Sequence, residues 1–121
     1  MKLSKTKIKI NAVEIGDYFL CYNKSLTHFE AKNLKNVGDY FLCFNESLTH
    51  FEANELNTVG NDFLRWNESI THFKANKLKN VGDCFLWYNK SLTHFEAKNL
   101  KIVGDYSLCY HPKRKELCRL L

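Results

Sequence analysis

The 121-residue sequence lacks a long apolar run, and no stretch approaches the roughly 18 to 20 apolar residues that a membrane-spanning helix needs. Its first residues, MKLSKTKIKINAVEIG, interleave lysine with isoleucine and have no apolar block before a small-residue cleavage site, unlike a secretory signal. We therefore expect a cytoplasmic chain as written, or a cell-surface location if the sequence is a piece of a larger protein.

Motifs for catalysis and for phosphate binding are also missing. The sequence has no glycine-rich phosphate loop, no nucleophile elbow and no H-E-x-x-H segment. Its acids and histidines come in several equivalent copies, whereas an active site needs one distinct pair of groups with separated pKa values. We predict that the protein is not an enzyme and binds no cofactor.

An excess of positive charge is absent from the body of the chain, although the formal net charge is +5. Residues 1–10 and 111–121 together contribute +7, which leaves −2 for the residues between them. Basic tails of this kind are more often solvated ends than nucleic-acid-binding arms. We expect no nucleic-acid partner.

The sequence does have a repeat. Glycine recurs every 22 residues, and the unit that begins at Leu26 reads L-x-x-F-x-A-x-x-L-x-x-V-G-D-x-F-L-x-aromatic-N-x-S. A unit of this size cannot bury its own apolar side chains, so the units must stack as a solenoid. We predict a capping segment at residues 1–10, a solenoid of one partial and four full units at residues 11–110, and a basic tail or cap at residues 111–121.

The five cysteines form no C-x-x-C pair. Cys21, Cys43 and Cys109 share a repeat position that Arg65 and Trp87 fill in the other units. A disulfide framework or zinc site would not tolerate arginine and tryptophan there. We interpret the cysteines as reduced packing residues.

The spacing of apolar residues changes along each unit. In residues 26–31, Phe29 and Ala31 alternate with His28 and Glu30, which predicts a short strand with one buried face. From Leu34 onward the apolar residues return every three or four positions, as in a helical or 3₁₀ turn. We expect the glycine of each unit to permit a tight bend.

The pattern L-x-x-F-x-A-x-x-L-x-x-V-G-x-x-F-L resembles a leucine-rich repeat, most closely the BspA-type subclass, over about residues 11–110. The resemblance implies an α/β repeat solenoid with a parallel β-sheet on a concave face and short helical or 3₁₀ turns on the convex face. Departures are a unit one residue shorter than usual, alanine at the third strand position and the absence of the proline after the strand. The alternative fold is a parallel β-helix, which would need alternation on two or three faces.

The resemblance also implies that the outward side chains of the strands form a protein-binding surface on the concave face. Three columns of residues point that way. They are His28, His50, His72 and His94; Glu30, Glu52, Lys74 and Glu96; and Lys32, Asn54, Asn76 and Lys98.

Three interpretations of the histidine column remain open. Duplication could have copied a tolerated exposed residue, or the column could be part of a polar protein-binding face whose charge falls with rising pH. A third option is that neighbouring imidazoles share Zn²⁺ or Cu²⁺ with a glutamate. In all three cases, protonated histidines in neighbouring units (neighbouring rungs of the ladder) should repel one another. This repulsion should lower their pKa values and spread their titration over a wider pH range, although nearby glutamates have the opposite effect.

Three other columns have structural interpretations. The aromatic column could be a stacking platform for bases or sugars, but packing between coils is the favoured role. The asparagine column should hydrogen-bond the backbone of adjacent turns. The column after each glycine should cap the following turn. In order, these columns are Tyr22, Phe44, Trp66, Tyr88 and Tyr110; Asn23, Asn45, Asn67 and Asn89; and Asp17, Asp39, Asn61, Asp83 and Asp105.

The ends of the solenoid need caps. Ile8 and Ile10 lie one position out of phase with Phe29 and Ala31, which predicts a shifted capping strand. The segment KRKELCRLL could form one or two amphipathic helical turns over the last coil. Both caps are thin, which favours either end-to-end self-association or a fragment of a longer repeat protein.

The most direct function for such a chain is a non-catalytic protein–protein interaction module that binds through the strand face. The alternative is a structural or vestigial fragment of a larger leucine-rich-repeat protein with no specific ligand. Metal binding by the histidine ladder is a further alternative.

Overall fold

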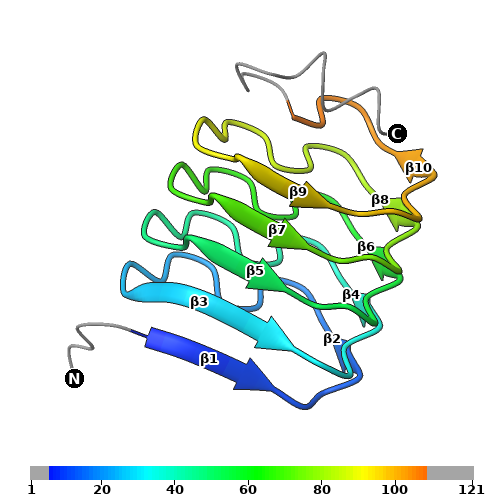
Figure 1. Cartoon of the computed structure of the whole chain (residues 1–121), viewed down its shortest axis with the longest axis horizontal. Coiled ribbons are helices and arrows are strands. Elements are labelled where there is room, and N and C mark those ends of the chain that lie inside the picture. The colour runs from blue at the N-terminus through cyan, green and yellow to red at the C-terminus, as the bar shows by residue number, and fades with distance from the viewer. Residues whose placement is uncertain (1–5, 109–121) are drawn as a thin grey trace.

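The computed structural model describes residues 6–108 and shows a repeat solenoid built from two parallel β-sheets (Figure 1). One sheet has the order β1-β3-β5-β7-β9 and the other the order β10-β8-β6-β4-β2. The first sheet contains β1 (Thr6–Ile10), β3 (Leu26–Ala31), β5 (His50–Glu52), β7 (His72–Lys74) and β9 (His94–Glu96). The second contains β2 (Glu14–Ile15), β4 (Asn36–Val37), β6 (Thr58–Val59), β8 (Asn80–Val81) and β10 (Ile102–Val103).

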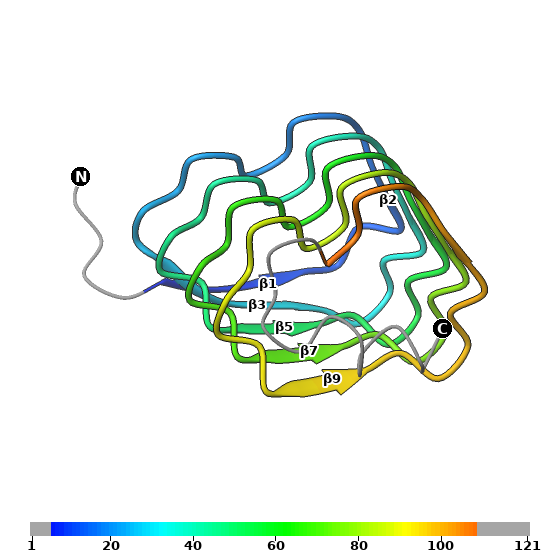
Figure 2. The same ribbon diagram turned by 90° about the horizontal axis from the view of Figure 1, so that it is seen from above.

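Strands pair in the register of the sequence repeat. His28 lies beside His50, and Phe29 lies beside Phe51, each pair being 22 residues apart. Val37 pairs in the same way with Val59 in the second sheet. The columns of the sequence are therefore columns in space, and the coils lie over one another when the molecule is seen along the stack (Figure 2).

The core is a stack of phenylalanine and aliphatic side chains between the two sheets. Phe29 and Phe51 stack with ring centroids 5.4 Å apart and planes at 3°. Phe41, from the turn on the far side of the coil, meets Phe29 edge-on at 5.3 Å and 80°. Two phenylalanine ladders thus meet edge to face, the favoured geometry for aromatic pairs, and this burial requires neighbouring coils.

The expected helical or 3₁₀ turns are not found, because residues 6–108 contain no helix. After the short strand β4, every second residue has a positive φ: Tyr40 (59°), Leu42 (57°) and Phe44 (58°). Backbone N–H groups in this segment bond to neighbouring coils instead of to their own turn, as Leu42 N does to Phe19 O at 3.1 Å. The segment is therefore held by hydrogen bonds between coils. With a second parallel sheet, the solenoid is like the parallel β-helix that was the alternative fold.

Positive φ restricts which residues this segment can hold. A left-handed conformation crowds Cβ against the backbone, most severely when the side chain is β-branched. The positive-φ positions hold no valine, isoleucine or threonine, and recur with the same spacing in the coils. They are Tyr18, Leu20, Tyr22, Tyr40, Leu42, Phe44, Asp62, Leu64, Trp66, Cys84, Leu86, Tyr88, Tyr106 and Leu108.

The glycine column has a different role from the predicted bend. None of the glycines has a positive φ. A Cβ added at Gly60 would lie 2.9 Å from the carbonyl carbon and oxygen of Gly38 and would also collide with the Asp39 carboxylate. Glycine is therefore needed because the backbones of successive coils approach too closely for a side chain.

Asparagine and aspartate side chains join the coils. Asn45 is fully buried; its Nδ2 donates to Leu20 O at 2.8 Å and its Oδ1 accepts from Asn23 N at 3.0 Å. The predicted bonding of asparagine to adjacent turns is thus observed. The aspartate column was expected to cap the turn that follows it in the chain, but Asp39 Oδ1 accepts from Asn61 N in the next coil at 2.7 Å.

Two of the cysteines of the shared repeat position pack inside the stack. Cys43 is buried, with Sγ donating to Asp62 O at 2.7 Å, and Cys21 makes the equivalent contact with Tyr40 O. Both are free thiols, and burial raises the pKa of the Cys43 thiol well above its ordinary range. Cys109 lies outside the described residues.

At the N-terminal end, the predicted shifted strand is confirmed. β1 pairs in parallel with β3, and Ile8 aligns with Phe29 and Ile10 with Ala31. Both isoleucines pack against the core. The predicted C-terminal tail or cap at residues 111–121 lies outside the described residues, as does Tyr110. Within residues 6–108 there is no helix of the length and apolarity required to cross a membrane.

Candidate functional site

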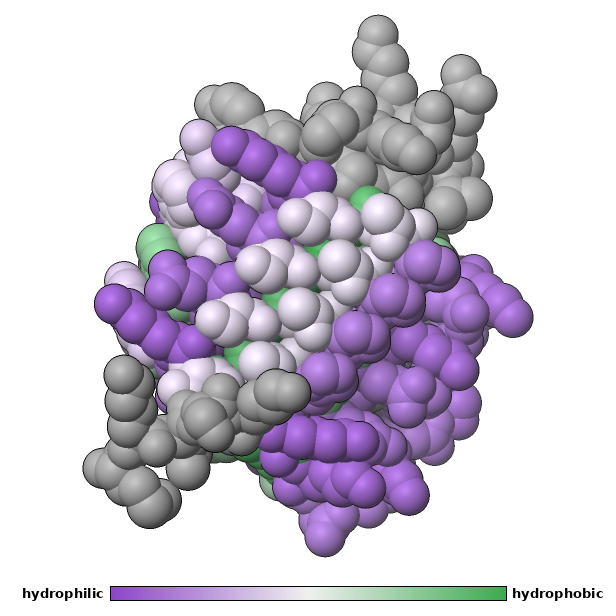
Figure 3. Space-filling model, turned by 60° about the vertical axis from the view of Figure 1, so that its left-hand side comes forward, coloured by the Kyte–Doolittle hydropathy of each residue, from purple (hydrophilic) through white to green (hydrophobic). Residues whose placement is uncertain are grey.

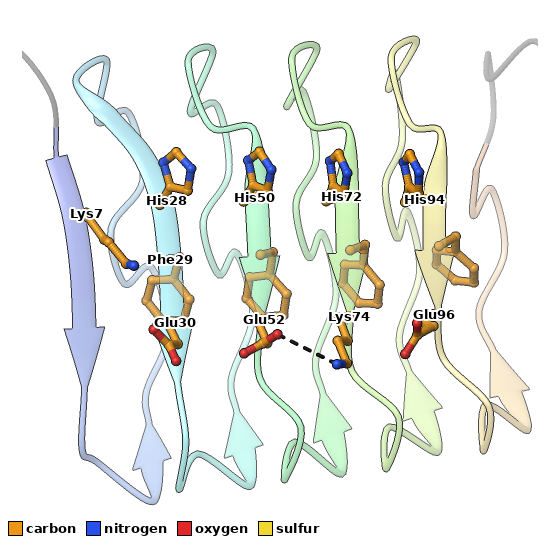
Figure 4. Close-up of a pocket in the computed structure, with 13 residues that line it drawn as sticks. Lys7, His28, Phe29, Glu30, His50, Glu52, His72, Lys74, His94 and Glu96 are labelled. Carbon is orange, nitrogen blue, oxygen red and sulfur yellow. Dashed lines mark ion pairs between the residues drawn. The ribbon is translucent and has the colours of Figure 1, made fainter.

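A hollow of about 600 Å³ runs across the outward face of the first sheet (Figure 4). We call it the strand trough. Its floor is the strand backbone at the phenylalanine positions, whose rings point into the core. The side walls are two columns that alternate with the phenylalanines, about 7 Å apart along each strand. One wall is His28, His50, His72 and His94, the other is Glu30, Glu52, Lys74 and Glu96, and Lys7 lines the β1 end.

The trough owes its depth to these side chains. Parallel strands are spaced about 4.8 Å apart, and both sides of each coil are strands in parallel sheets. The helices expected on the opposite side are absent from residues 6–108. The hollow on this face lies between two side-chain columns.

The histidine wall is a continuous stack of imidazole rings. Ring centroids are 4.5 Å apart for His28 and His50, 4.4 Å for His50 and His72, and 4.2 Å for His72 and His94. The planes of neighbouring rings differ by 6° to 10°. The ladder is possible because the repeat places histidine at the same register position in each strand.

Each ring is held by the threonine that precedes it. Thr71 Oγ1 lies 2.8 Å from His72 Nδ1, and the hydroxyl also donates to Thr49 O at 3.2 Å. A hydroxyl has a single proton to donate. Its oxygen must therefore accept from Nδ1–H, which leaves Nε2 of the neutral ring as an acceptor. The same pair of contacts fixes the tautomer of His50 and His94.

Protonation of the two inner histidines is disfavoured. Desolvation lowers the pKa of His50 below its ordinary value of 6.5, and the adjacent His28 lowers it further. The pKa of His72 is lowered by desolvation and by His94 and His50. These directions agree with the depression expected from like charges one rung apart.

We predict that stability falls as the pH drops below about 6.5, because the unfolded chain then binds protons at His50 and His72 that the folded chain resists. The contribution is complete above 6.5 and is lost as the pH falls toward the lowered pKa values. Chemical denaturation of the wild type and of the His50→Gln, His72→Gln double variant at several pH values checks this. Equal losses of stability in the two proteins between neutral and mildly acidic pH would contradict the prediction.

The opposite wall carries charges that are loosely paired. Lys74 Nζ lies 4.0 Å from Glu52 Oε1, and Lys9 Nζ lies 3.9 Å from Glu30 Oε2. Glu96 accepts a hydrogen bond of 2.8 Å from Asn76 Nδ2. That hydrogen bond, followed by the charges of Lys74 and Lys98, lowers the pKa of the Glu96 carboxyl. Two of the three carboxylates therefore have a cation nearby but beyond hydrogen-bond distance.

The third predicted column does not line the strand trough. Lys32 and Asn54 line a separate hollow of about 170 Å³ with Glu30 and Glu52. Further along the column, Asn76 Oδ1 accepts from Lys98 N at 3.4 Å. The structure thus brings together the first two predicted columns and places Lys32, Asn54, Asn76 and Lys98 beside them.

Lys7 and the threonine column were absent from the predicted site. Lys7 pairs with His28 in the register of β1 and β3, so its side chain reaches the end of the trough (Figure 4). The one-position shift of the Lys-Ile alternation was the available signal. For the threonines, the signal was the dipeptide Thr-His at positions 27, 49, 71 and 93.

The surface seen in Figure 3 is mainly polar. A stripe of side chains of intermediate hydropathy runs across the coils, with hydrophilic side chains on either side and hydrophobic colour only in small gaps. This view offers no broad apolar patch for docking.

The aromatic column packs between coils, as favoured from the sequence. Tyr22 and Phe44 stack at 4.7 Å, Phe44 and Trp66 at 6.1 Å, and Trp66 and Tyr88 at 4.0 Å. Because each ring covers the next, ring edges rather than faces point outward along the column. The exception is Tyr22, which is 71% exposed at the first coil.

The histidine ladder has a geometry unlike that of a chelating site. Neighbouring rings are almost parallel, so their Nε2 lone pairs point side by side rather than toward a common point. A metal shared by two rungs would require both rings to leave the stack and their threonine contacts. Within residues 6–108, no group of three or more histidine, cysteine, aspartate or glutamate side chains is arranged to hold a metal ion.

Comparisons of the chain with protein-family models, with curated proteins and with solved structures find no match.

Proposed function

We propose that the protein is a non-catalytic interaction module that binds another protein through the strand trough. The observation that carries this proposal is the pairing of two polar columns across a 600 Å³ hollow on an otherwise regular sheet. The histidine wall supplies fixed hydrogen-bond acceptors and the opposite wall supplies charges, both on rigid strands. Groups held by a scaffold in this way lose little conformational freedom on binding.

The proposal includes membership of the leucine-rich-repeat class, with the BspA-type subclass as the nearest pattern. Its support is the recurrence of L-x-x-F-x-A-x-x-L-x-x-V-G in successive units together with the parallel sheet that those units form. Proteins of that class commonly bind partners on the strand face.

A pull-down tests the proposal. The variant His50→Ala, Glu52→Ala, His72→Ala, Lys74→Ala removes the centre of both walls. The matched control, Asn57→Ala, Thr58→Ala, Lys79→Ala, Asn80→Ala, changes outward positions on or next to β6 and β8 in the opposite sheet. We expect the first variant to lose partners that the wild type and control retain, and equal partner lists for all three would defeat the proposal.

A structural or vestigial repeat without a ligand is the second candidate. It is favoured by the sameness of the rungs, because the histidine column does not vary and the opposite wall changes only at Lys74. A binding surface usually differs from rung to rung. Failure of the wild type to retain any partner above the level of the trough variant supports this candidate.

A further inference from the structure

We propose that the partner segment accepted by the strand trough is basic, with arginine or lysine side chains lying between the histidine and the glutamate of one rung. This inference rests on the proposed function and names the chemistry of the partner. It also implies that acidification releases the partner.

The first support is that both walls carry hydrogen-bond acceptors, apart from the amines of Lys7 and Lys74. The threonine contacts leave Nε2 as the acceptor atom of the neutral rings of His50, His72 and His94. The carboxylates of Glu30, Glu52 and Glu96 form the opposite wall, two residues further along each strand than the histidines. A side chain that fits between two rows of acceptors must donate in both directions, which a planar guanidinium does with its five N–H groups.

The second support is that the chain already places cations at this wall. Lys74 occupies the glutamate position of its rung and its Nζ lies 4.0 Å from Glu52 (Figure 4). Lys7 lines the β1 end of the trough. The strands that combine a histidine with a glutamate are therefore those of His28, His50 and His94. The strand of His72 carries Lys74, whose amine lies near Glu52 of the preceding strand.

Acid should reverse the complementarity. Protonation at Nε2 changes each ring from an acceptor to a donor and sets positive charges 4.2 to 4.5 Å apart. The charged groups that face the ladder are Lys7 and Lys9 from β1 and the glutamate wall with Lys74. At neutral pH these three lysines balance the three carboxylates, so four imidazolium groups would leave a net charge of +4 and repel a basic segment.

The experiment is a fluorescence anisotropy titration of the full chain with a labelled peptide that alternates arginine and serine. A peptide with glutamate in place of arginine is the control probe. We expect binding of the arginine peptide at neutral pH and about tenfold weaker binding near pH 5. Equal affinity for the two peptides, or unchanged affinity on acidification, overturns the inference.

Single-residue variants locate the binding in the trough. Glu52→Gln should weaken binding about threefold, and Lys74→Glu should strengthen it about threefold or more by giving the third rung its carboxylate. The matched controls lie outside the trough. Glu68→Gln removes an exposed acid, and Lys77→Glu reverses the cation paired with Glu55. Circular dichroism confirms that each variant is folded before titration.

The controls decide between a site and general charge attraction. If Lys77→Glu strengthens peptide binding as much as Lys74→Glu does, the trough is not the site and the inference falls. If partners captured from cells depend on the trough but the arginine peptide does not bind, the proposed function stands and only its basic partner is wrong.

Discussion

Asn45→Asp is expected to lower the free energy of unfolding by about 3 to 5 kcal/mol at neutral pH, the cost of an uncompensated buried charge. Asn45 is fully buried, and its Nδ2 donates to the carbonyl oxygens of Leu20 at 2.8 Å and Cys43 at 3.3 Å. In the Asn45→Asp side chain, an oxygen would replace Nδ2 and would face the carbonyl oxygens of Leu20 and Cys43, which cannot donate to it. The other oxygen could still accept from Asn23 N.

The cost of Asn45→Asp should shrink in acid. Burial raises the pKa of the new carboxyl in the folded chain above its unfolded value of about 3.9. The folded state therefore binds the proton more tightly, and stability relative to wild type is greatest below that value and is lost as the pH rises. Urea denaturation of both proteins at several pH values measures the difference.

Two further substitutions separate charge from lost hydrogen bonds. Asn45→Leu also removes the bonds to Leu20 and Cys43, but its cost should not depend on pH. Asn61→Asp makes the same chemical change at an exposed position where the equivalent residue of other coils is aspartate, and should be nearly neutral. A cost for Asn45→Asp no larger than that for Asn61→Asp would show that the asparagine ladder does not join the coils.

The inward side chains were predictable because their alternation with polar residues can be seen within a single short segment of the sequence. Phe29 and Ala31 alternate with polar residues over one short strand, and the 22-residue repeat then places each copy above the last. The same reasoning gave the shifted strand at Ile8. Alternation identifies which side of a strand is buried, and repetition identifies what buries it.

The second half of the coil was not predictable in the same way. Apolar residues at 34, 37, 41 and 42 have helical spacing, yet Val37 belongs to a strand and Leu42 has a φ of 57°. The pattern records which side chains are buried but not the sign of φ. A segment with alternating positive φ buries side chains at a similar spacing. Its backbone hydrogen bonds go to neighbouring coils, and the sequence of one repeat does not reveal them.

The candidate site shows the same division. Period-two alternation was enough to place the histidine and glutamate columns on one face. Which ring nitrogen of His72 is the acceptor was not accessible, because it depends on a hydroxyl proton that Thr71 donates to Thr49 in the preceding coil. The chemistry of the ladder is therefore set by contacts between repeats rather than by the residues of one repeat.

Gly60→Ala is expected to lower the free energy of unfolding by about 1 to 3 kcal/mol, the usual cost of overpacking. The added methyl would lie 2.9 Å from the backbone of Gly38, and Gly60 N also bonds to Val37 O at 3.0 Å. Because part of the contact is with backbone, rotation of the Asp39 side chain alone does not relieve it. The two coils would have to separate locally and strain that hydrogen bond.

Gly16→Ala is the matched control, since it is the same substitution in the same column. A Cβ at Gly16 has no atom within 4 Å. There the alanine only restricts the unfolded chain, which stabilises a protein by about 0.4 to 1 kcal/mol where the backbone allows it. Thermal and urea denaturation of both variants should therefore give shifts of opposite sign, or a shift for Gly60→Ala alone. Equal shifts would mean that the glycine column serves the conformation of each coil rather than the distance between coils.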